Sequence, residues 1–258
     1  MTQPRPAAEP NDKAAADLEA AWTRLAAAQA AALATLDRRH RTAAASALAD
    51  FAAEAKAFRH AADRAVRDFA LRVVPERYEA AARAAAASIN RPFSWTPAHR
   101  ATLQALTADT YTDLSLRVQE AARVAAAFHR AVRAAARRSF TPTSAAQLAA
   151  AHPLDRVVYR NGARMPVRAW AEAATLARTA VAYNAGTLSV AREHGIPHVE
   201  VTDGADCGWT SHPDPDKAAR TVRTVEDAAQ WPIAHPRCAR AFGLRPDAEV
   251  GIGPTPTV

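Results

Sequence analysis

The sequence of 258 residues is poor in cysteine, glycine and aromatic residues. Two cysteines cannot build a disulfide scaffold, so we expect synthesis in a reducing, cytosolic compartment. Eight glycines and 6% aromatic residues argue against a strand-rich fold. No run of about 18 uncharged apolar residues occurs, so no membrane span and no membrane partner are expected.

Helical periodicity dominates the first 150 residues. The pattern over 12–74 predicts helix throughout, since apolar residues recur at alternating steps of three and four over 48–73 and more loosely over 22–36. One straight helix of that length would measure on the order of 90 Å, so we expect this stretch to fold back on itself or to form an arm. Pro75 should break or kink the helix, and a shorter helix follows over 76–88. A long helix over 97–138 is the expected antiparallel partner. The histidines on these helices are expected at the surface or its edge: His40, His60, His99 and His129.

The excess of positive charge lies entirely in this helical part. Residues 1–150 carry 21 Lys and Arg against 14 Asp and Glu, whereas residues 151–258 carry 12 of each. A solvated helical surface is the first interpretation, and a face for phosphate backbones or an acidic partner protein is the second. The arginines assigned to such a nucleic-acid or partner contact are Arg59, Arg64, Arg67, Arg133, Arg137 and Arg138.

The composition changes near residue 150, where we predict a domain boundary. We expect a disordered lead-in over 1–12, a helical arm or hairpin domain over 13–150, a small α+β module over 151–245 and a flexible tail over 246–258. The predicted fold class is mainly α: a long Ala- and Arg-rich helical N-terminal part followed by a small α+β module with a Cys/His-stapled loop.

Strand and turn signals appear only in the second part. A hairpin is predicted over 156–167 with its turn near Asn161-Gly162, because both turn residues tolerate positive φ. A helix over 167–194 should end at Gly195. Alternation of apolar and polar residues over 198–202 predicts a half-buried strand.

Both cysteines lie within residues 199–242, and each has a histidine at ligand spacing. Cys207 and His212 form one half-site, and His235 and Cys238 form the other after 22 intervening residues. Thiolate and imidazole groups suit zinc, and a tetrahedral ion needs two such half-sites brought together by the fold. Four protein ligands would close the coordination sphere, so this zinc would be structural.

Other interpretations of these residues stay open. The cysteines can pair as a disulfide, or they can be buried thiols while the two histidines cap turns. An enzyme would need a water molecule in place of one ligand, with Asp203, Asp206 or Glu226 as the base.

The last third of the chain also carries five short motifs in a fixed order. They are Y-R-N-G from Tyr159, A-R-T-A-V-A-Y-N-A-G-T from Ala177, A-R-E-H-G-I-P-H-V-E-V from Ala191, D-G-A-D-C-G-W-T-S-H from Asp203 and H-P-R-C-A-R from His235. Together they resemble the tailed-phage head-morphogenesis (MuF-type) minor head proteins. The chain departs from that family in two places: Ala-Arg replaces the Arg-Cys of its H-P-x-C-R-C ending, and C-x4-H replaces C-x2-C.

The resemblance implies a structural minor head protein of a tailed phage or prophage, without enzymatic activity. Such a protein acts in head morphogenesis near the portal, has portal, scaffold or capsid proteins as partners, and in some cases contacts packaged DNA. It would be assembled in the host cytoplasm and reside in the virion. The competing functions are a metal-dependent hydrolase, such as a capsid maturation protease or nuclease, and a DNA-compacting basic helical protein.

The family's recurring helix signature falls on Arg178, Thr179 and Asn184 in this sequence. We expect Arg178 and Asn184 to lie near one another on the helix and to hold the following strand or the zinc loop. An exposed helix face is the alternative.

Overall fold

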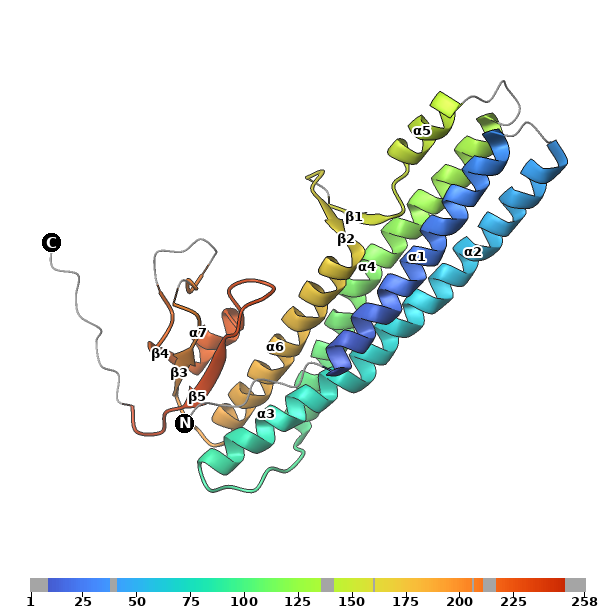
Figure 1. Cartoon of the computed structure of the whole chain (residues 1–258). Coiled ribbons are helices and arrows are strands. Elements are labelled where there is room, and N and C mark those ends of the chain that lie inside the picture. Colours follow the sequence, from blue (N-terminus) through green and yellow to red (C-terminus); the bar gives the residue numbers. More distant parts are fainter. Residues whose placement is uncertain are drawn as a thin grey trace, which may run out of the picture. The chain divides into compact units, whose positions relative to one another are not determined.

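The computed structural model describes residues 9–37, 41–135, 142–159, 161–205, 207–210 and 217–248 (Figure 1). The predicted mainly α class, with a long helical N-terminal part and a small sheet-containing module after it, is confirmed. Within the described ranges, no helix combines the length and the apolar character needed to cross a membrane. The elements in chain order are α1 (Glu9–Asp37), α2 (Arg41–Asp68), the π-helical turn η1 (Phe69–Val73), α3 (Val74–Ser88), α4 (Pro97–Ala135), α5 (Pro142–Ala151), β1 (Arg156–Val158), β2 (Arg164–Pro166), α6 (Val167–Glu193), β3 (His198–Thr202), β4 (Val222–Thr224), α7 (Val225–Gln230) and β5 (Ala241–Leu244).

The chain divides into two compact units, and each is discontinuous in sequence. The first unit consists of Met1–Ala70 and Asp109–Thr175, and the second of Leu71–Ala108 and Leu176–Val258. Each unit therefore contains residues from both sides of residue 150, where the composition shift predicted a domain boundary.

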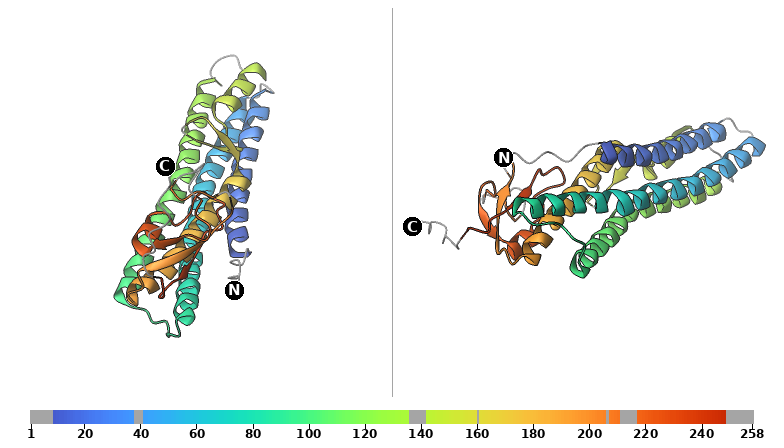
Figure 2. Two further views of the ribbon diagram at one scale, coloured as in Figure 1. Left: turned by 90° about the vertical axis from the view of Figure 1, so that its left-hand side faces the viewer. Right: turned by 90° about the horizontal axis from the view of Figure 1, so that it is seen from below.

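The first unit is a helical assembly in which the stretch predicted as one long helix folds back on itself. Helix α1 ends at Asp37 and α2 begins at Arg41, and the two helices lie side by side (Figures 1 and 2). Helix α1 already begins at Glu9, inside the predicted lead-in over 1–12, because Pro10 in a first helical turn loses no hydrogen bond. Residues 1–8 lie outside the described part of the chain.

Aromatic side chains are among the largest residues in the core of the first unit, which otherwise consists mainly of Ala, Leu and Val. The rings of Phe51 in α2 and Phe128 in α4 are 4.9 Å apart, and the Tyr111 hydroxyl of α4 donates to Asp63 of α2 at 2.6 Å. Phe51, near the start of α2, contacts Phe128, near the end of α4, whereas Asp63, later in α2, contacts Tyr111, earlier in α4. The two helices therefore run antiparallel, as predicted. Helix α4 ends at Ala135, and the last three residues of its predicted range lie outside the described part.

Pro75 does not end the helical path. The chain continues from α2 through η1 into α3, and Pro75 occupies the first turn of α3. A π turn shifts the hydrogen-bonding partners by one residue, which accommodates the missing N–H of proline. The predicted interruption therefore takes the form of a widened turn over Phe69–Val73 rather than a break.

The second unit contains a three-stranded antiparallel sheet with β3 in the centre, in the order β4-β3-β5. Strand β3 covers the predicted range 198–202, and its Val199 and Val201 are buried with Trp209 and Phe242. Helix α6 spans Val167–Glu193 and is followed by Gly195 at φ +63°, as predicted for a helix stop. The predicted hairpin is present in the first unit as β1 and β2.

Candidate metal centre

Two tight turns present the candidate ligands in the second unit. Cys207 closes a turn that follows β3, since its backbone N–H donates to the Gly204 carbonyl at 3.2 Å. Cys238 closes a turn that precedes β5, and its N–H donates to the His235 carbonyl at 2.9 Å. Because β3 and β5 are paired antiparallel strands, the two turns lie at the same end of the sheet.

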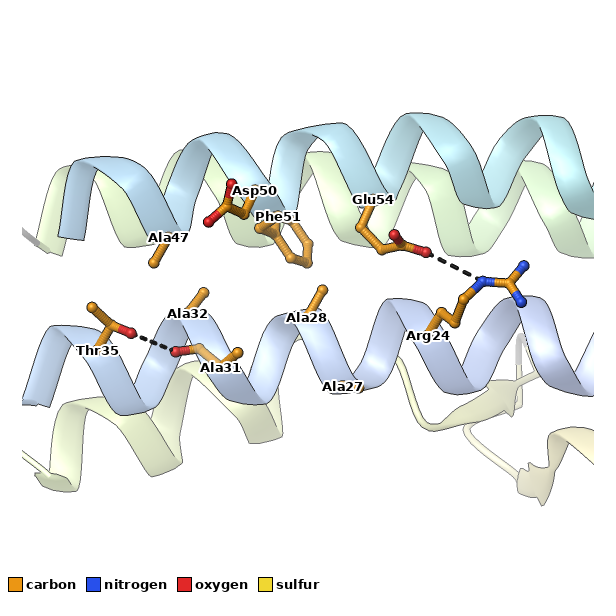
Figure 3. A pocket seen from close by; sticks show the side chains of 10 residues that line it. All are labelled: Arg24, Ala27, Ala28, Ala31, Ala32, Thr35, Ala47, Asp50, Phe51 and Glu54. Atoms are coloured by element: carbon orange, nitrogen blue, oxygen red, sulfur yellow. Dashed lines mark hydrogen bonds and ion pairs between the residues drawn. The ribbon is translucent and has the colours of Figure 1, made fainter. Parts of the chain in front are cut away.

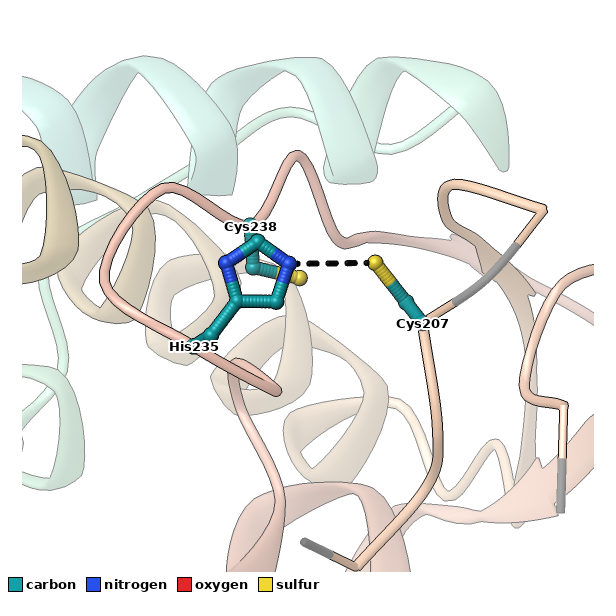
Figure 4. A group of neighbouring side chains, drawn as sticks. All are labelled: Cys207, His235 and Cys238. Carbon is teal, nitrogen blue, oxygen red and sulfur yellow. Dashed lines mark hydrogen bonds between the residues drawn. The ribbon is translucent and has the colours of Figure 1, made fainter. Parts of the chain in front are cut away.

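Cys207, His235 and Cys238 meet there and form a cluster that can hold a metal ion (Figure 4). The Cys207 sulfur is 3.3 Å from His235 Nε2, and the three ligand atoms lie within 4.8 Å of one another. Bonds of about 2.0–2.3 Å in a tetrahedral zinc site place ligand atoms roughly 3.3–3.8 Å apart. Small side-chain shifts therefore suffice to bring all three donors to one ion.

The remaining sequence-predicted ligand, His212, lies outside the described residues, as does Asp206. Both cysteines are buried free thiols, so they do not form the disulfide that the sequence left open. Burial raises the pKa of Cys207 to about 12, with further contributions from Asp203 and Cys238. A thiol in this place is protonated at neutral pH unless a cation takes its thiolate.

A buried ion pair borders the cluster. Arg240 contacts the Asp203 carboxylate through Nε at 2.8 Å and through an Nη at 2.7 Å, and both side chains are 0% exposed. The other Asp203 oxygen accepts from the Gly204 N–H at 2.9 Å and from the Cys238 thiol at 3.2 Å. Asp203, which directly follows β3, thus connects that strand to one of the candidate ligands.

Arg240 also binds the backbone of the neighbouring loops. It donates to the carbonyls of Gly208, Trp209 and Trp231, with 2.8 Å to Trp231 and 3.4 Å to Trp209. Its guanidinium carbon lies 4.8 Å from the centre of the Trp209 ring, a favourable cation–π contact. In the sequence, Arg240 stands two residues after Cys238, at the position where the family ending differs. That position is the only sequence signal for its contacts to the loops, and it did not predict them.

Asn184 holds the His235–Cys238 loop from the side of helix α6. Its side-chain amide donates to the carbonyls of Pro232 at 2.7 Å and Arg240 at 2.9 Å. Thr179 is buried and donates to the Leu176 carbonyl of its own helix, and Arg178 is half-buried on the same helix. Of the three predicted signature residues, Asn184 therefore has direct contacts to the loop.

The base candidates of the hydrolase alternative differ in their surroundings. Both oxygens of Asp203 accept hydrogen bonds, and one of them is held by Arg240. Glu226 is exposed in the first turn of α7. Neither side chain is placed as an unengaged base beside the three candidate ligands.

His99 contradicts the expectation that the helical histidines lie at the surface. It is 1% exposed, and its ring nitrogens contact the Tyr78 hydroxyl at 2.7 Å and the Glu193 carboxylate at 2.9 Å. Phe93 and Trp95 pack edge-on against its ring. The connector over 90–97 folds its aromatic residues over this histidine, which helical spacing alone does not predict.

The arginines predicted to contact nucleic acid or a partner protein belong to the first unit. Arg59, Arg64 and Arg133 are exposed, whereas Arg137 and Arg138 lie outside the described residues. Arg67 is exposed as well, but it pairs with Asp63 at 3.0 Å and lies over the Tyr111 ring.

A shallow groove of about 380 Å³ lies between α1 and α2 in the first unit (Figure 3). Alanines make up half of its lining residues, and the ion pair of Arg24 with Glu54, at 3.5 Å, lies at one end. Its two carboxylates, Asp50 and Glu54, do not form a group of three possible metal ligands, and Glu54 is paired with Arg24.

Comparisons of the chain with protein-family models, with curated proteins and with solved structures found no match. The candidate metal centre accordingly rests on the geometry of Cys207, His235 and Cys238, and the family likeness rests on the five sequence motifs.

Proposed function

We propose that this protein is a structural minor head protein of a tailed phage or prophage, and that a zinc ion holds its C-terminal module together. The observation that carries the proposal is the meeting of ligands from two separate motifs, D-G-A-D-C-G-W-T-S-H and H-P-R-C-A-R, in one cluster. The same two motifs carry the resemblance to the minor head family.

Zinc is the ion that this donor set favours. Two thiolates and one imidazole are soft and borderline ligands, which select zinc over magnesium or calcium. We propose Cys207, His235 and Cys238 as three ligands and His212 as the fourth. With four protein ligands the ion holds the loops together and has no open coordination position for a reacting water molecule.

The surroundings of the cluster favour a structural role over hydrolysis. A hydrolytic metal site needs an open coordination position and a base that can accept a proton from the bound water. Asp203, which accepts from the Cys238 thiol, is also engaged by Arg240 and Gly204. We therefore propose that the protein is not an enzyme.

The proposed partners are portal, scaffold or capsid proteins, with packaged DNA as a further contact, in a virion assembled in the host cytoplasm. The exposed arginines of the first unit support a contact with an anionic partner. Mass spectrometry of purified virions from a host that carries this gene tests the location. Peptides of this chain at low copy number are expected, and their absence from intact virions contradicts the proposal.

Metal analysis of the purified protein tests the zinc centre. We expect about one zinc ion per chain, and we expect Cys238→Ala to lower the zinc content to background. Loss of a structural ion lowers the free energy of unfolding by a few kcal/mol, so the thermal midpoint should fall by roughly 10 °C. His194→Ala, which changes an exposed histidine of the same unit, is the control and should alter neither quantity.

The same variant separates the structural function from the hydrolase alternative. If the protein hydrolyses a protein or nucleic-acid substrate, and Cys238→Ala abolishes this activity while the thermal midpoint stays unchanged, the ion is catalytic. Loss of stability without any activity to lose supports the structural role.

A further inference from the structure

We propose that the buried ion pair of Asp203 and Arg240 acts as a non-covalent, metal-independent cross-link that assembles the ligand loops before an ion binds. The expected effect of this ion pair on metal affinity rests on the zinc centre of the proposed function. Its expected effect on the loops themselves needs no metal. Arg240 is a positioning residue, since it contacts ligand-bearing segments and not the ion.

The contacts of Arg240 reach the segments on both sides of the cluster of Cys207, His235 and Cys238. The carbonyls of Gly208 and Trp209 belong to the loop of Cys207, and the carbonyl of Trp231 precedes His235. A guanidinium has five N–H donors in a fixed plane, and these three carbonyls together with the two contacts to Asp203 match that number. One side chain therefore connects the loop of Cys207 to the loop of His235 and Cys238.

The ion pair also sets the charge beside the ligands. An Asp203 oxygen lies 3.2 Å from the Cys238 sulfur, so an unpaired carboxylate there would repel the two thiolates that a metal requires. Arg240 offsets the charge of Asp203, and both side chains are fully buried. The charges of a divalent ion and two thiolates then balance in this buried place.

Lysine is a poor substitute in this position. A primary ammonium has three donors on a flexible stem, whereas the planar guanidinium is preorganised for several acceptors. The guanidinium also lies against the face of Trp209, at 4.8 Å from the ring centre. Arg240→Lys keeps the positive charge but removes the planar set of guanidinium donors, so this variant separates the role of geometry from that of charge.

Hydrogen exchange of the full chain in reductant and a strong chelator tests the cross-link without metal. We expect the wild-type protein to keep protected amides over 199–205, 207–210 and 217–244, because Arg240 still joins the loops. Arg240→Met should lower this protection by at least about tenfold, while Cys207→Ser combined with Cys238→Ser should retain it. Arg245→Met is the matched control, because Arg245 pairs with Glu200 and Asp247 at the surface of the same sheet.

Titration with Co²⁺ and then Zn²⁺ in competition with a chromophoric chelator tests the effect on the metal site. Groups that orient metal ligands typically contribute a factor of about 10 to 100 in affinity. We expect Arg240→Lys and Asp203→Asn to weaken Co²⁺ binding by about that factor and to reduce the intensity of the tetrahedral absorption bands. Arg245→Met should bind Co²⁺ as the wild-type protein does.

The outcomes distinguish this inference from the zinc proposal. If the wild-type protein binds no metal but Arg240→Met still loses amide protection, the zinc centre is refuted and the cross-link is supported. If the wild-type protein binds metal while both Arg240 variants keep their protection and their affinity, the cross-link is overturned. It is overturned as well if the chelated wild-type protein loses protection to the same extent as Arg240→Met. If Arg240→Met prevents folding altogether, Arg240→Lys and Asp203→Asn provide the same comparison.

Discussion

At Gly186, helix α6 passes close to the backbone of α3 in the second unit. A Cβ atom at this position would lie 2.3 Å from the carbonyl oxygen of Tyr78, well inside the contact distance of real Cβ atoms. Two positions earlier on the same helix, Asn184 holds the loop of His235 and Cys238. The glycine therefore permits the approach that positions both the helix and its loop.

Gly186→Ala should destabilise the protein although alanine is the better helix former. Helix propensity alone would favour alanine by about 1 kcal/mol. The clash with a backbone atom reverses the sign, and we expect a loss of about 2–3 kcal/mol in the free energy of unfolding, measured by urea denaturation. Gly243→Ala is the control, because a Cβ there meets no atom within 4 Å. Equal or higher stability of Gly186→Ala would show that α3 and α6 do not approach each other this closely.

Among the elements, α1 is held in the first unit by a few large side chains among many alanines. Trp22 is 2% exposed, and its ring lies 4.6 Å from Phe58 of α2 and 5.7 Å from Trp170 of α6. Alanine buries little apolar area, so a helix this rich in alanine depends strongly on its aromatic contacts. Trp22 joins three helical elements at one point.

Trp22→Ala should lower the free energy of unfolding by about 3–5 kcal/mol, because it leaves a large cavity between α1 and α2. Trp22→Phe should be less destabilising, since part of the aromatic contact remains. Thr23→Ala changes the adjacent exposed residue and should alter stability by less than about 0.5 kcal/mol. Chemical denaturation followed by far-UV circular dichroism measures all three, and a small effect of Trp22→Ala would contradict this packing of α1.

Across the whole molecule, the net charge of +7 arises from residues 1–150. Of the arginines assigned to an anionic partner, Arg59 and Arg64 are exposed on α2 and Arg67 pairs with Asp63 on the same helix. Exposed cations bind DNA through release of counterions, so their contribution depends steeply on salt.

If the anionic partner is DNA, the affinity of the protein for it should fall steeply between about 50 and 200 mM salt. Each of Arg59→Gln and Arg64→Gln should reduce the slope of log K against log salt by roughly 0.9, because one phosphate fewer is neutralised. Arg67→Gln should change the slope less, because Asp63 already neutralises that charge. Fluorescence anisotropy with a labelled duplex at several salt concentrations measures the slopes. A flat salt response would exclude DNA as the partner and leave an acidic protein surface.

Local patterns along the chain were sufficient to predict the helical class, the strand over 198–202, the hairpin and the stop of α6 at Gly195. They also singled out the three residues that meet in the candidate metal centre. These features depend on local periodicity, turn chemistry and ligand spacing, all of which a single segment of sequence contains. Helix boundaries were predicted less well, as the start of α1 at Glu9 and the π turn before Pro75 show.

Which distant residues share a core could be learned from the fold alone. The two units each combine segments from both sides of residue 150, since burial depends on which helix faces meet and not on composition along the sequence. For the same reason His99 is buried between Tyr78 and Glu193, and Arg240 and Asp203 pair 37 residues apart. A polar side chain is stable in such a place only when several partners surround it, and spacing along one segment cannot reveal partners on another.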